Sequence, residues 1–199
     1  MREFGELLSE SVAFHGHLCP GQVLGVRMTM AGCRALGIEE PKGMRKSLVV
    51  FVEIDRCATD AIQALTDCSL GKRTLKHLDY GKMAATFVNV PTGNAVRVVA
   101  RDDARQRAAA YAPDEPEPRA AQTLAYRVMP EAELLNLEPV VIQPGWLDRK
   151  RVRVLCQECG EGVNYGLEAV SYGLTLCRAC SGERYYQPQL AAEKGPSTH

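Results

Sequence analysis

The sequence predicts an α+β fold, in which helices and an antiparallel sheet share one N-terminal domain, followed by a small cysteine-based domain. Apolar side chains recur at helical spacing over residues 2–13, whereas residues 47–54 form a short apolar, β-branched run typical of a buried strand. Two further strand-like runs, 84–90 and 95–100, are joined by a turn sequence containing Pro, Gly and Asn, which favours a hairpin. Two Cys-x-x-Cys motifs near the C-terminal end predict the small domain.

The first half of the chain is predicted to be mainly helical. The helix over 2–13 is amphipathic, and a second helix runs over 20–36. Pro20 suits the first position of that second helix. A proline has no backbone N–H, and the N–H at this position would have no partner within the helix. This places Cys19 at or near the helix N-cap. A third helix, 59–65, follows the predicted strand.

The second half alternates helices, loops and strands. Residues 101–111 are predicted to form an exposed helix, and the polar, Pro-rich segment 113–119 is predicted to be a loop. Met129-Pro130 can open a short helix, which a strand over 140–143 follows. Pro144-Gly145 then indicates a domain boundary.

These elements suggest three parts. We expect an α+β domain over 1–147, a four-cysteine zinc domain over 148–187, and a flexible tail over 188–199. The tail is assigned from its polar, proline-containing composition.

Composition argues against several classes of function. The net charge is zero and 46% of residues are hydrophobic, so no global electrostatic field draws the chain to nucleic acid or to an anionic membrane. Only 6% of residues are aromatic, which argues against a base-stacking surface. No secretory signal is evident, and no apolar run approaches 18 residues, so we expect a cytoplasmic protein without a membrane span.

The eight cysteines are the main chemical signal in the chain. In a small secreted protein they would suggest disulfides. Here they are grouped with histidines in a chain that we expect in a reducing compartment. That setting favours metal binding or thiol chemistry over disulfides.

The C-terminal cysteines have the spacing of a four-cysteine zinc site. Cys156 and Cys159 form one Cys-x-x-Cys pair, and Cys177 and Cys180 form the second, seventeen residues further on. Four protein ligands close a tetrahedral coordination sphere, so we expect a structural zinc rather than a catalytic one. Four reduced cysteines, or two disulfides, are the alternative. The basic run 149–153 also permits nucleic-acid binding, although a short basic run is usually a solvated surface.

A second group of donors lies near the N-terminus. His15, His17 and Cys19 alternate, and on an extended loop such positions project to one side. Cys19 at a helix N-terminus favours the thiolate, the form that binds a metal or attacks an electrophile. His15 or His17 could then act as a base beside a nucleophilic Cys19.

Cys57 and Cys68 are predicted to join this group. Cys57 follows a buried strand and Cys68 lies just past a helix, positions at which functional loops gather. Together with His17 and Cys19 they would form a second site, for zinc or another transition metal or for a reactive thiol. The alternative is that both are small buried side chains, the role that we assign to Cys33.

A basic pair in the following loop extends this hypothesis. Lys72 and Arg73 lie a few residues after Cys68 and could attract an anionic group of a ligand. Lys72 is therefore a candidate cofactor-binding residue.

Several of these motifs resemble one known family. The segment 14–21, with the sequence FHGHLCPG, looks like the signature of the FmdE-like proteins, which are named after a component of formylmethanofuran dehydrogenase. The segments 57–63, 66–75 and 79–84 are similar to further blocks of that family. The C-terminal four-cysteine module also resembles one that many family members carry.

The resemblance implies an α+β domain with a metal-binding cleft, a zinc-ribbon-like C-terminal domain, and a homodimer. His17, Cys19, Cys57 and Cys68 match the candidate site positions of the family, with His15 adjacent to them. It also implies an accessory protein that serves a molybdenum or tungsten enzyme complex. The chain has no iron–sulfur ferredoxin pattern, so it does not look like the catalytic component of such a complex.

The sequence leaves three functions open. The first is a metal-binding accessory protein linked to molybdenum or tungsten enzymes. The second is an enzyme that uses a metal-bound water or the Cys19 thiolate, with His15 as a candidate base. The third is a regulator that binds nucleic acid through the C-terminal module, which the neutral charge disfavours.

Overall fold

The computed structural model describes residues 1–148 and 151–187, and the chain forms two compact units, Met1–Ile142 and Gln143–His199. Each unit is described by itself below. The domain limits at 147/148 and 187/188 remain predictions. The predicted flexible tail, 188–199, lies outside the described residues.

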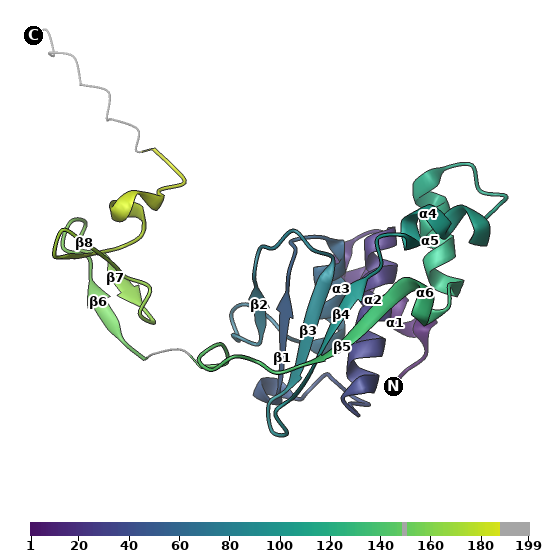
Figure 1. Ribbon diagram of the computed structural model, residues 1–199, viewed down its shortest axis with the longest axis horizontal. Coiled ribbons are helices and arrows are strands. Elements are labelled where there is room, and N and C mark those ends of the chain that lie inside the picture. The colour runs from purple at the N-terminus through teal and green to yellow at the C-terminus, as the bar shows by residue number, and fades with distance from the viewer. Residues whose placement is uncertain (149–150, 188–199) are drawn as a thin grey trace, which may run out of the picture. The chain divides into compact units, whose positions relative to one another are not determined.

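The first unit combines six α-helices with one five-stranded sheet (Figure 1). Its helices are α1 (Phe4–His15), α2 (Pro20–Ala35), α3 (Cys57–Thr66), α4 (Ala104–Tyr111), α5 (Pro118–Val128) and α6 (Glu131–Leu134). Its strands are β1 (Leu48–Val52), β2 (Leu75–His77), β3 (Ala84–Asn89), β4 (Asn94–Ala100) and β5 (Leu135–Val140), and a 3-10 turn, η1 (Arg45–Ser47), precedes β1. The predicted α+β fold is therefore confirmed.

The sheet has the strand order β2-β1-β3-β4-β5. Strand β1 pairs in parallel with β2, to which it is connected through α3, and all other pairs are antiparallel. The hairpin predicted from the turn sequence is β3–β4, with Phe87 opposite Val96. A parallel pair needs a crossover, and here the crossover is the helix that begins at Cys57.

Side chains on one face of the sheet form the hydrophobic core with α1, α2 and α3. Leu48, Val50 and Val52 of β1 face this core and are at most 1% exposed. They alternate along the strand with residues of the other face, as the pleat of a strand requires. Phe87 of β3 and Met28 of α2 are fully buried in the same cluster. This packing fixes α2 and α3 side by side on the sheet.

Two glycines allow α2 to approach its neighbours closely. A Cβ at Gly25 would lie 2.5 Å from the carbonyl oxygen of Ala58 in α3. A Cβ at Gly32 would lie 2.4 Å from the ring of Phe87. Neither distance leaves space for a methyl group, so the glycines set the spacing between α2, α3 and β3.

The structure differs from the sequence prediction mainly in the second half of this unit. The segment 113–119 is not a loop throughout, as predicted, because α5 begins at Pro118 within it. The Glu117 side chain caps this helix by accepting from the backbone N–H groups of Arg119 and Ala120, and a proline is harmless at the first helical position. The last strand, β5, also begins earlier than the predicted strand over 140–143.

The second unit is built from short hairpins around the four cysteines. Strands β6 (Arg153–Leu155) and β7 (Gly162–Asn164) pair antiparallel, and so do β8 (Ala169–Ser171) and β9 (Leu174–Leu176). A short π-helical segment, η2 (Ala179–Glu183), follows β9. Among the described residues of this unit, Cys156 and Leu176 are the buried apolar ones, so we expect its folding to depend strongly on the cysteine cluster.

Among the described residues, no helix combines the length and the apolar character that crossing a bilayer requires.

The tight contact between α2 and α3 leads to a stability prediction. We expect Gly25→Ala to destabilise the first unit by about 1–3 kcal/mol, because the added methyl meets backbone atoms that cannot move independently. The matched control is Gly5→Ala, since a Cβ at Gly5 in α1 would have no neighbour within 4 Å. That control should leave stability unchanged or raise it by up to about 1 kcal/mol. Urea unfolding followed by circular dichroism measures both, and equal effects of the two substitutions would contradict the packing argument.

Candidate functional site

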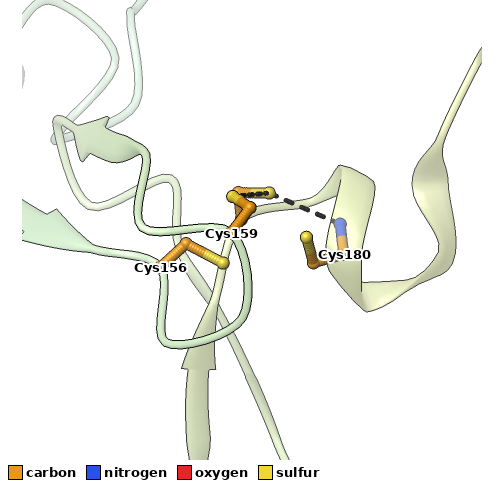
Figure 2. Close-up of side chains that lie close together, drawn as sticks. Cys156, Cys159 and Cys180 are labelled. Atoms are coloured by element: carbon orange, nitrogen blue, oxygen red, sulfur yellow. Dashed lines mark hydrogen bonds between the residues drawn. The ribbon is translucent and has the colours of Figure 1, made fainter. Parts of the chain in front are cut away.

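The sulfur atoms of the four C-terminal cysteines converge on one point (Figure 2). Cys156 and Cys159 lie in the turn between β6 and β7, whereas Cys177 directly follows β9 and Cys180 lies in η2. All four sulfur atoms lie within 4.8 Å of one another, and those of Cys159 and Cys177 are 3.9 Å apart. A tetrahedral zinc with bonds of about 2.3 Å needs sulfur atoms about 3.8 Å apart. The cluster could therefore bind a metal ion.

The cluster also has the electrostatics of a cation site. The backbone N–H groups of Cys159 and Cys177 lower the pKa of the Cys156 thiol to about 6. A hydrogen bond with the neighbouring Cys177 raises the pKa of Cys180 to about 12. Sulfur atoms this close cannot all ionise unless a cation balances their charge. Arg184 already places a guanidinium nitrogen 3.9 Å from the Cys180 sulfur.

The N-terminal donors lie where α1 ends and α2 begins. Helix α1 ends at His15, and Gly16 adopts the left-handed conformation with φ +95° that closes the helix. The chain then turns back, so that Cys19 caps α2 and is 4% exposed. The side-chain donor atoms of His15, His17 and Cys19 all lie within 4.8 Å of one another. The structure therefore brings these three predicted residues together.

His15 is held by a carboxylate that the sequence analysis did not single out. Its Nδ1 lies 2.7 Å from an Oδ2 atom of Asp60, one turn into α3. Its other ring nitrogen, Nε2, is buried and has no hydrogen-bond partner among the described residues. A histidine that pairs one nitrogen with a carboxylate and leaves the other free inside a donor cluster has the arrangement typical of a metal ligand.

Cys57, in the first turn of α3, lies beside Cys19, although its sulfur is not among the donor atoms that lie within 4.8 Å of one another. Burial, a hydrogen-bond contact with the Cys19 thiol and the charge of that thiol raise the pKa of Cys57. The side chain of Gln22, which is fully buried in α2, donates to the Cys57 carbonyl oxygen at 2.5 Å and accepts from Ser11 of α1. One amide thus links the three helices that carry the donors.

Two hollows border the donor cluster. One, of about 390 Å³, is lined by His15, Cys57 and Asp60 together with Asp55, Arg56 and Thr59. The other, of about 660 Å³, is a groove between the His17–Pro20 segment and α5. Both volumes fall in the range of small-molecule sites. The cluster is therefore reachable, unlike a purely structural metal site.

The structure does not bring Cys68 to this cluster. Cys68 lies beyond the other end of α3 from Cys57, and the ten residues of this helix span about 15 Å. Its thiol points to the Leu48 carbonyl oxygen at 3.6 Å, and burial raises its pKa. Sequence position alone did not predict this separation, because Cys57 and Cys68 lie at opposite ends of α3. Cys68 lies with Cys33 in the hydrophobic core.

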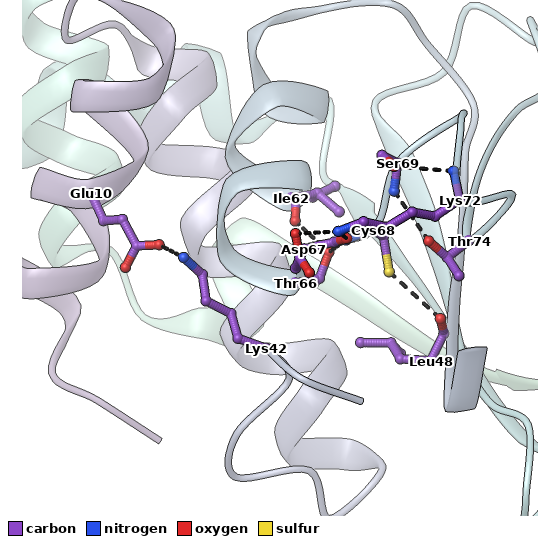
Figure 3. A network of polar contacts seen from close by, with 10 residues as sticks. All are labelled: Glu10, Lys42, Leu48, Ile62, Thr66, Asp67, Cys68, Ser69, Lys72 and Thr74. Carbon is purple, nitrogen blue, oxygen red and sulfur yellow. Dashed lines mark hydrogen bonds and ion pairs between the residues drawn. The ribbon is translucent and has the colours of Figure 1, made fainter. Parts of the chain in front are cut away.

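Lys72 likewise lies away from the His17–Cys19 loop. Its ammonium group binds the Asp67 carboxylate at 2.6 Å and the Asp67 carbonyl oxygen at 3.2 Å (Figure 3). Asp67 ends α3 in the left-handed conformation, so Lys72 neutralises the negative end of that helix. Arg73 is in the same loop.

The sequence analysis missed Asp60, Gln22 and the arginines of α5. Asp60 lies three residues after Cys57 and so shares a helix face with that thiol. This spacing could have identified Asp60 as a candidate site residue. Gln22 gave no signal, because a glutamine in an apolar helix looks like a surface residue. Arg119 and Arg127 were missed because the start of α5 has the composition of a loop.

Comparison with known families and proteins adds a second line of findings. Residues 14–136 match the family described as FmdE, Molybdenum formylmethanofuran dehydrogenase operon. The matched range contains His15, His17, Cys19 and Cys57 and ends before the four-cysteine cluster. The match confirms the resemblance that the motifs suggested.

Two individual proteins are similar over different shares of the chain. A probable S-adenosyl-L-methionine-binding protein from Archaeoglobus fulgidus is 40% identical over 94 residues, which is 46% of this chain and 26% of that protein. The chain thus matches about a quarter of the length of that relative. The crystal structure of an FmdE-like protein of the tungsten formylmethanofuran dehydrogenase type, from Syntrophus aciditrophicus, has a TM-score of 0.64 at 24% identity, with 94% of this chain and 96% of that chain covered. This likeness supports the same fold.

The contact between Cys19 and Cys57 can be tested by a substitution next to it. A Cβ at Gly21 would lie 2.8 Å from the Cys57 Cβ and 3.7 Å from the Cys19 sulfur. We expect Gly21→Ala to push α3 away, to destabilise the first unit by about 1–3 kcal/mol, and to reduce bridging of the two thiols by phenylarsine oxide. Peptide mapping by mass spectrometry detects the bridge and separates it from arsenic bound at the C-terminal cluster.

Cys68→Ala is the matched control for this experiment. It removes a cysteine that lies at the far end of α3, so arsenic bridging of Cys19 and Cys57 should persist. Loss of the bridge in this control, or full bridging in Gly21→Ala, would show that the thiols are arranged differently.

Proposed function

Because the chain belongs to the FmdE family, we propose that it is a metal-binding accessory protein of molybdenum- or tungsten-dependent formylmethanofuran dehydrogenase-type enzymes. One observation carries the metal-binding part of this proposal. The donor atoms of His15, His17 and Cys19 lie within 4.8 Å of one another beside two solvent-open hollows.

The residues present fit a transition metal. Imidazole nitrogen and thiolate sulfur together favour zinc and its neighbours over magnesium or calcium. The buried Nε2 of His15 has no partner among the described residues, and the Asp60 carboxylate holds the ring through Nδ1, which leaves Nε2 as the nitrogen available to a metal. Cys57 would be the fourth donor or would hold Cys19 in position through its thiol. A bound metal would supply an electrophilic centre for a ligand or a substrate.

The second metal of the proposal is a structural zinc at Cys156, Cys159, Cys177 and Cys180. Four thiolates close the coordination sphere, and no position remains for a ligand. The small hairpins of the second unit would depend on this ion for their stability, because structural zinc supplies folding free energy to such modules.

The accessory role rests on the family and not on the site. The family description refers to the operon of a molybdenum formylmethanofuran dehydrogenase, and the similar crystal structure is described as FmdE-like for the tungsten enzyme. Handling of a metal or cofactor for such a complex would use an accessible donor cluster. We further propose a cytoplasmic homodimer, which the neutral net charge permits.

A second candidate function is a metal- or thiol-dependent enzyme on a small molecule. The observation that favours it is the pair His15–Asp60, at 2.7 Å, next to the Cys19 thiol. A carboxylate that orients a histidine beside a thiol is an arrangement found in cysteine nucleophile sites. In such an enzyme His15 would be the base and Cys19 the nucleophile.

Metal analysis of the purified chain tests the proposal. We expect two metal ions per chain by inductively coupled plasma mass spectrometry. Cys19→Ser should remove the N-terminal ion alone, because it deletes a donor, and Cys177→Ser should remove the C-terminal ion alone. Cys33→Ala is the matched control, since Cys33 is a core residue outside both clusters, and it should retain both ions.

The pattern of metal loss separates the two candidate functions. One ion per chain that is unaffected by Cys19→Ser would end the proposal of a metal site near the N-terminus. Rapid alkylation of Cys19 in the same sample would then favour the thiol enzyme.

The accessory role needs its own measurement. We expect the chain to co-elute with a formylmethanofuran dehydrogenase-type complex when the two are mixed and separated by size-exclusion chromatography, and Cys33→Ala to behave as the unmodified chain. Elution of the chain entirely at its own volume, with both metals bound, would contradict a stable association with that complex.

A further inference from the structure

The groove beside the donor cluster carries an inference about the ligand, which rests on the function proposed above. The groove is lined by the His17–Pro20 segment and by residues of α5. Arg119, Thr123 and Arg127 line that face at intervals of four residues, so they form a single stripe along the helix. The groove has a volume of about 660 Å³, large enough for a molecule of drug or cofactor-fragment size.

The two carboxylates at the rim of the groove are already committed to the backbone. Glu117 accepts hydrogen bonds from the N–H groups of Arg119 and Ala120 at 3.0 and 2.6 Å, and these bonds lower its pKa. Glu115 accepts from the N–H group of Glu117 at 3.1 Å. Both acids therefore serve to cap α5 and close the preceding turn.

The side chains of the two arginines of the groove have no such hydrogen bonds in the described chain, although the charge of Arg119 helps to lower the pKa of Glu117. Within the described part of the chain, neither the Arg119 nor the Arg127 guanidinium group has a hydrogen bond or an ion pair within 4 Å. Both side chains are exposed. A guanidinium group matches a carboxylate or phosphate in shape and charge, so the stripe offers donors to an anion.

The arginine stripe is held in a fixed position relative to the donor cluster. Arg27 of α2 donates to the carbonyl oxygens of Tyr126 and Met129 at 3.0 and 2.9 Å, and so ties the C-terminal end of α5 to α2. Cys19 is the N-cap residue of the same α2 helix. A ligand that touches both the arginines and the cluster therefore meets a preorganised frame.

Part of the wall of the groove is apolar. Leu18, Pro20, Ala120 and Leu124 line it, and Leu18 and Leu124 are each 44% exposed. An apolar chain that lies over these exposed leucines removes their surface from water, and this burial favours binding. The groove thus has three parts: soft donors, an apolar wall, and cationic side chains.

We propose that this groove binds an elongated anionic small molecule, with its carboxylate or phosphate on Arg119 and Arg127, an apolar chain over Leu18 and Leu124, and a metal-binding end at the cluster. The arginines would select for charge, and the length of the apolar wall would select for chain length. Both selections act on binding, before any chemistry at the metal.

A series of thiol probes tests this proposal with the full chain. The chain is loaded with cobalt(II) at the N-terminal cluster and titrated with mercaptoacetate, 3-mercaptopropionate and 6-mercaptohexanoate. The matched neutral probe is 6-mercaptohexanol. Binding of a probe thiolate to cobalt is read from its charge-transfer absorption, and the dissociation constant is measured by isothermal titration calorimetry.

We expect one chain length among the carboxylates to bind best, and about fivefold more tightly than its alcohol analogue, since exposed charge pairs contribute modestly. The double variant Arg119→Gln, Arg127→Gln should lose this preference while it retains the cobalt signal with 6-mercaptohexanol. The control Arg45→Gln, Lys46→Gln removes the same charge at η1, at the opposite end of β1 from the cluster, and should keep the preference.

Each outcome decides between the proposals. Cobalt that binds with no carboxylate preference, or a preference that the control variant loses equally, overturns the assignment of the groove. Cobalt that does not bind counts against the metal-binding function. The groove is then tested on the metal-free chain with hexanoate and hexanol, and equal affinities for these two overturn it.

Discussion

The candidate site depends on one buried amide, the side chain of Gln22. It is fully buried in α2, accepts from the Ser11 hydroxyl of α1, and donates to the Cys57 carbonyl oxygen at the start of α3. A buried amide that lacked these partners would cost about 1–3 kcal/mol, so the three helices are held in one register. His15, Cys19 and Cys57 are carried at ends of these same helices, and the convergence of their side chains follows from that register.

The close packing of glycines reinforces this constraint. Gly21 and Gly25 lie on the side of α2 that faces α3, and any larger side chain would separate the two helices. Gly32 makes the equivalent approach to Phe87 of the sheet. The site is therefore built on rigid elements on both sides, which a metal centre requires to hold its donors at fixed distances. In the second unit, two tight turns and four short strands hold the four cysteines close together.

The two clusters differ in what surrounds them. The four C-terminal sulfurs lie within 4.8 Å of one another and are enough in number to complete a tetrahedral coordination sphere. The N-terminal donors are fewer, lie beside open hollows, and include a histidine nitrogen without a partner in the described chain. Coordination that is closed suits a structural ion, and coordination that is open suits a ligand. The arginine stripe of α5 borders the open cluster.

Much of this protein was determined by its sequence alone. The helices α1, α2 and α3, the hairpin β3–β4 and the four-cysteine cluster were all predicted, because apolar periodicity, turn residues and cysteine spacing are local signals. The tertiary structure decided which distant residues meet. It placed Cys57 beside Cys19 and carried Cys68 away, because the length of a helix separates residues that are close in sequence. It also brought Asp60 to His15 and α5 to the groove. These contacts arise from the packing of helices on one sheet, and no periodicity in the sequence predicts them.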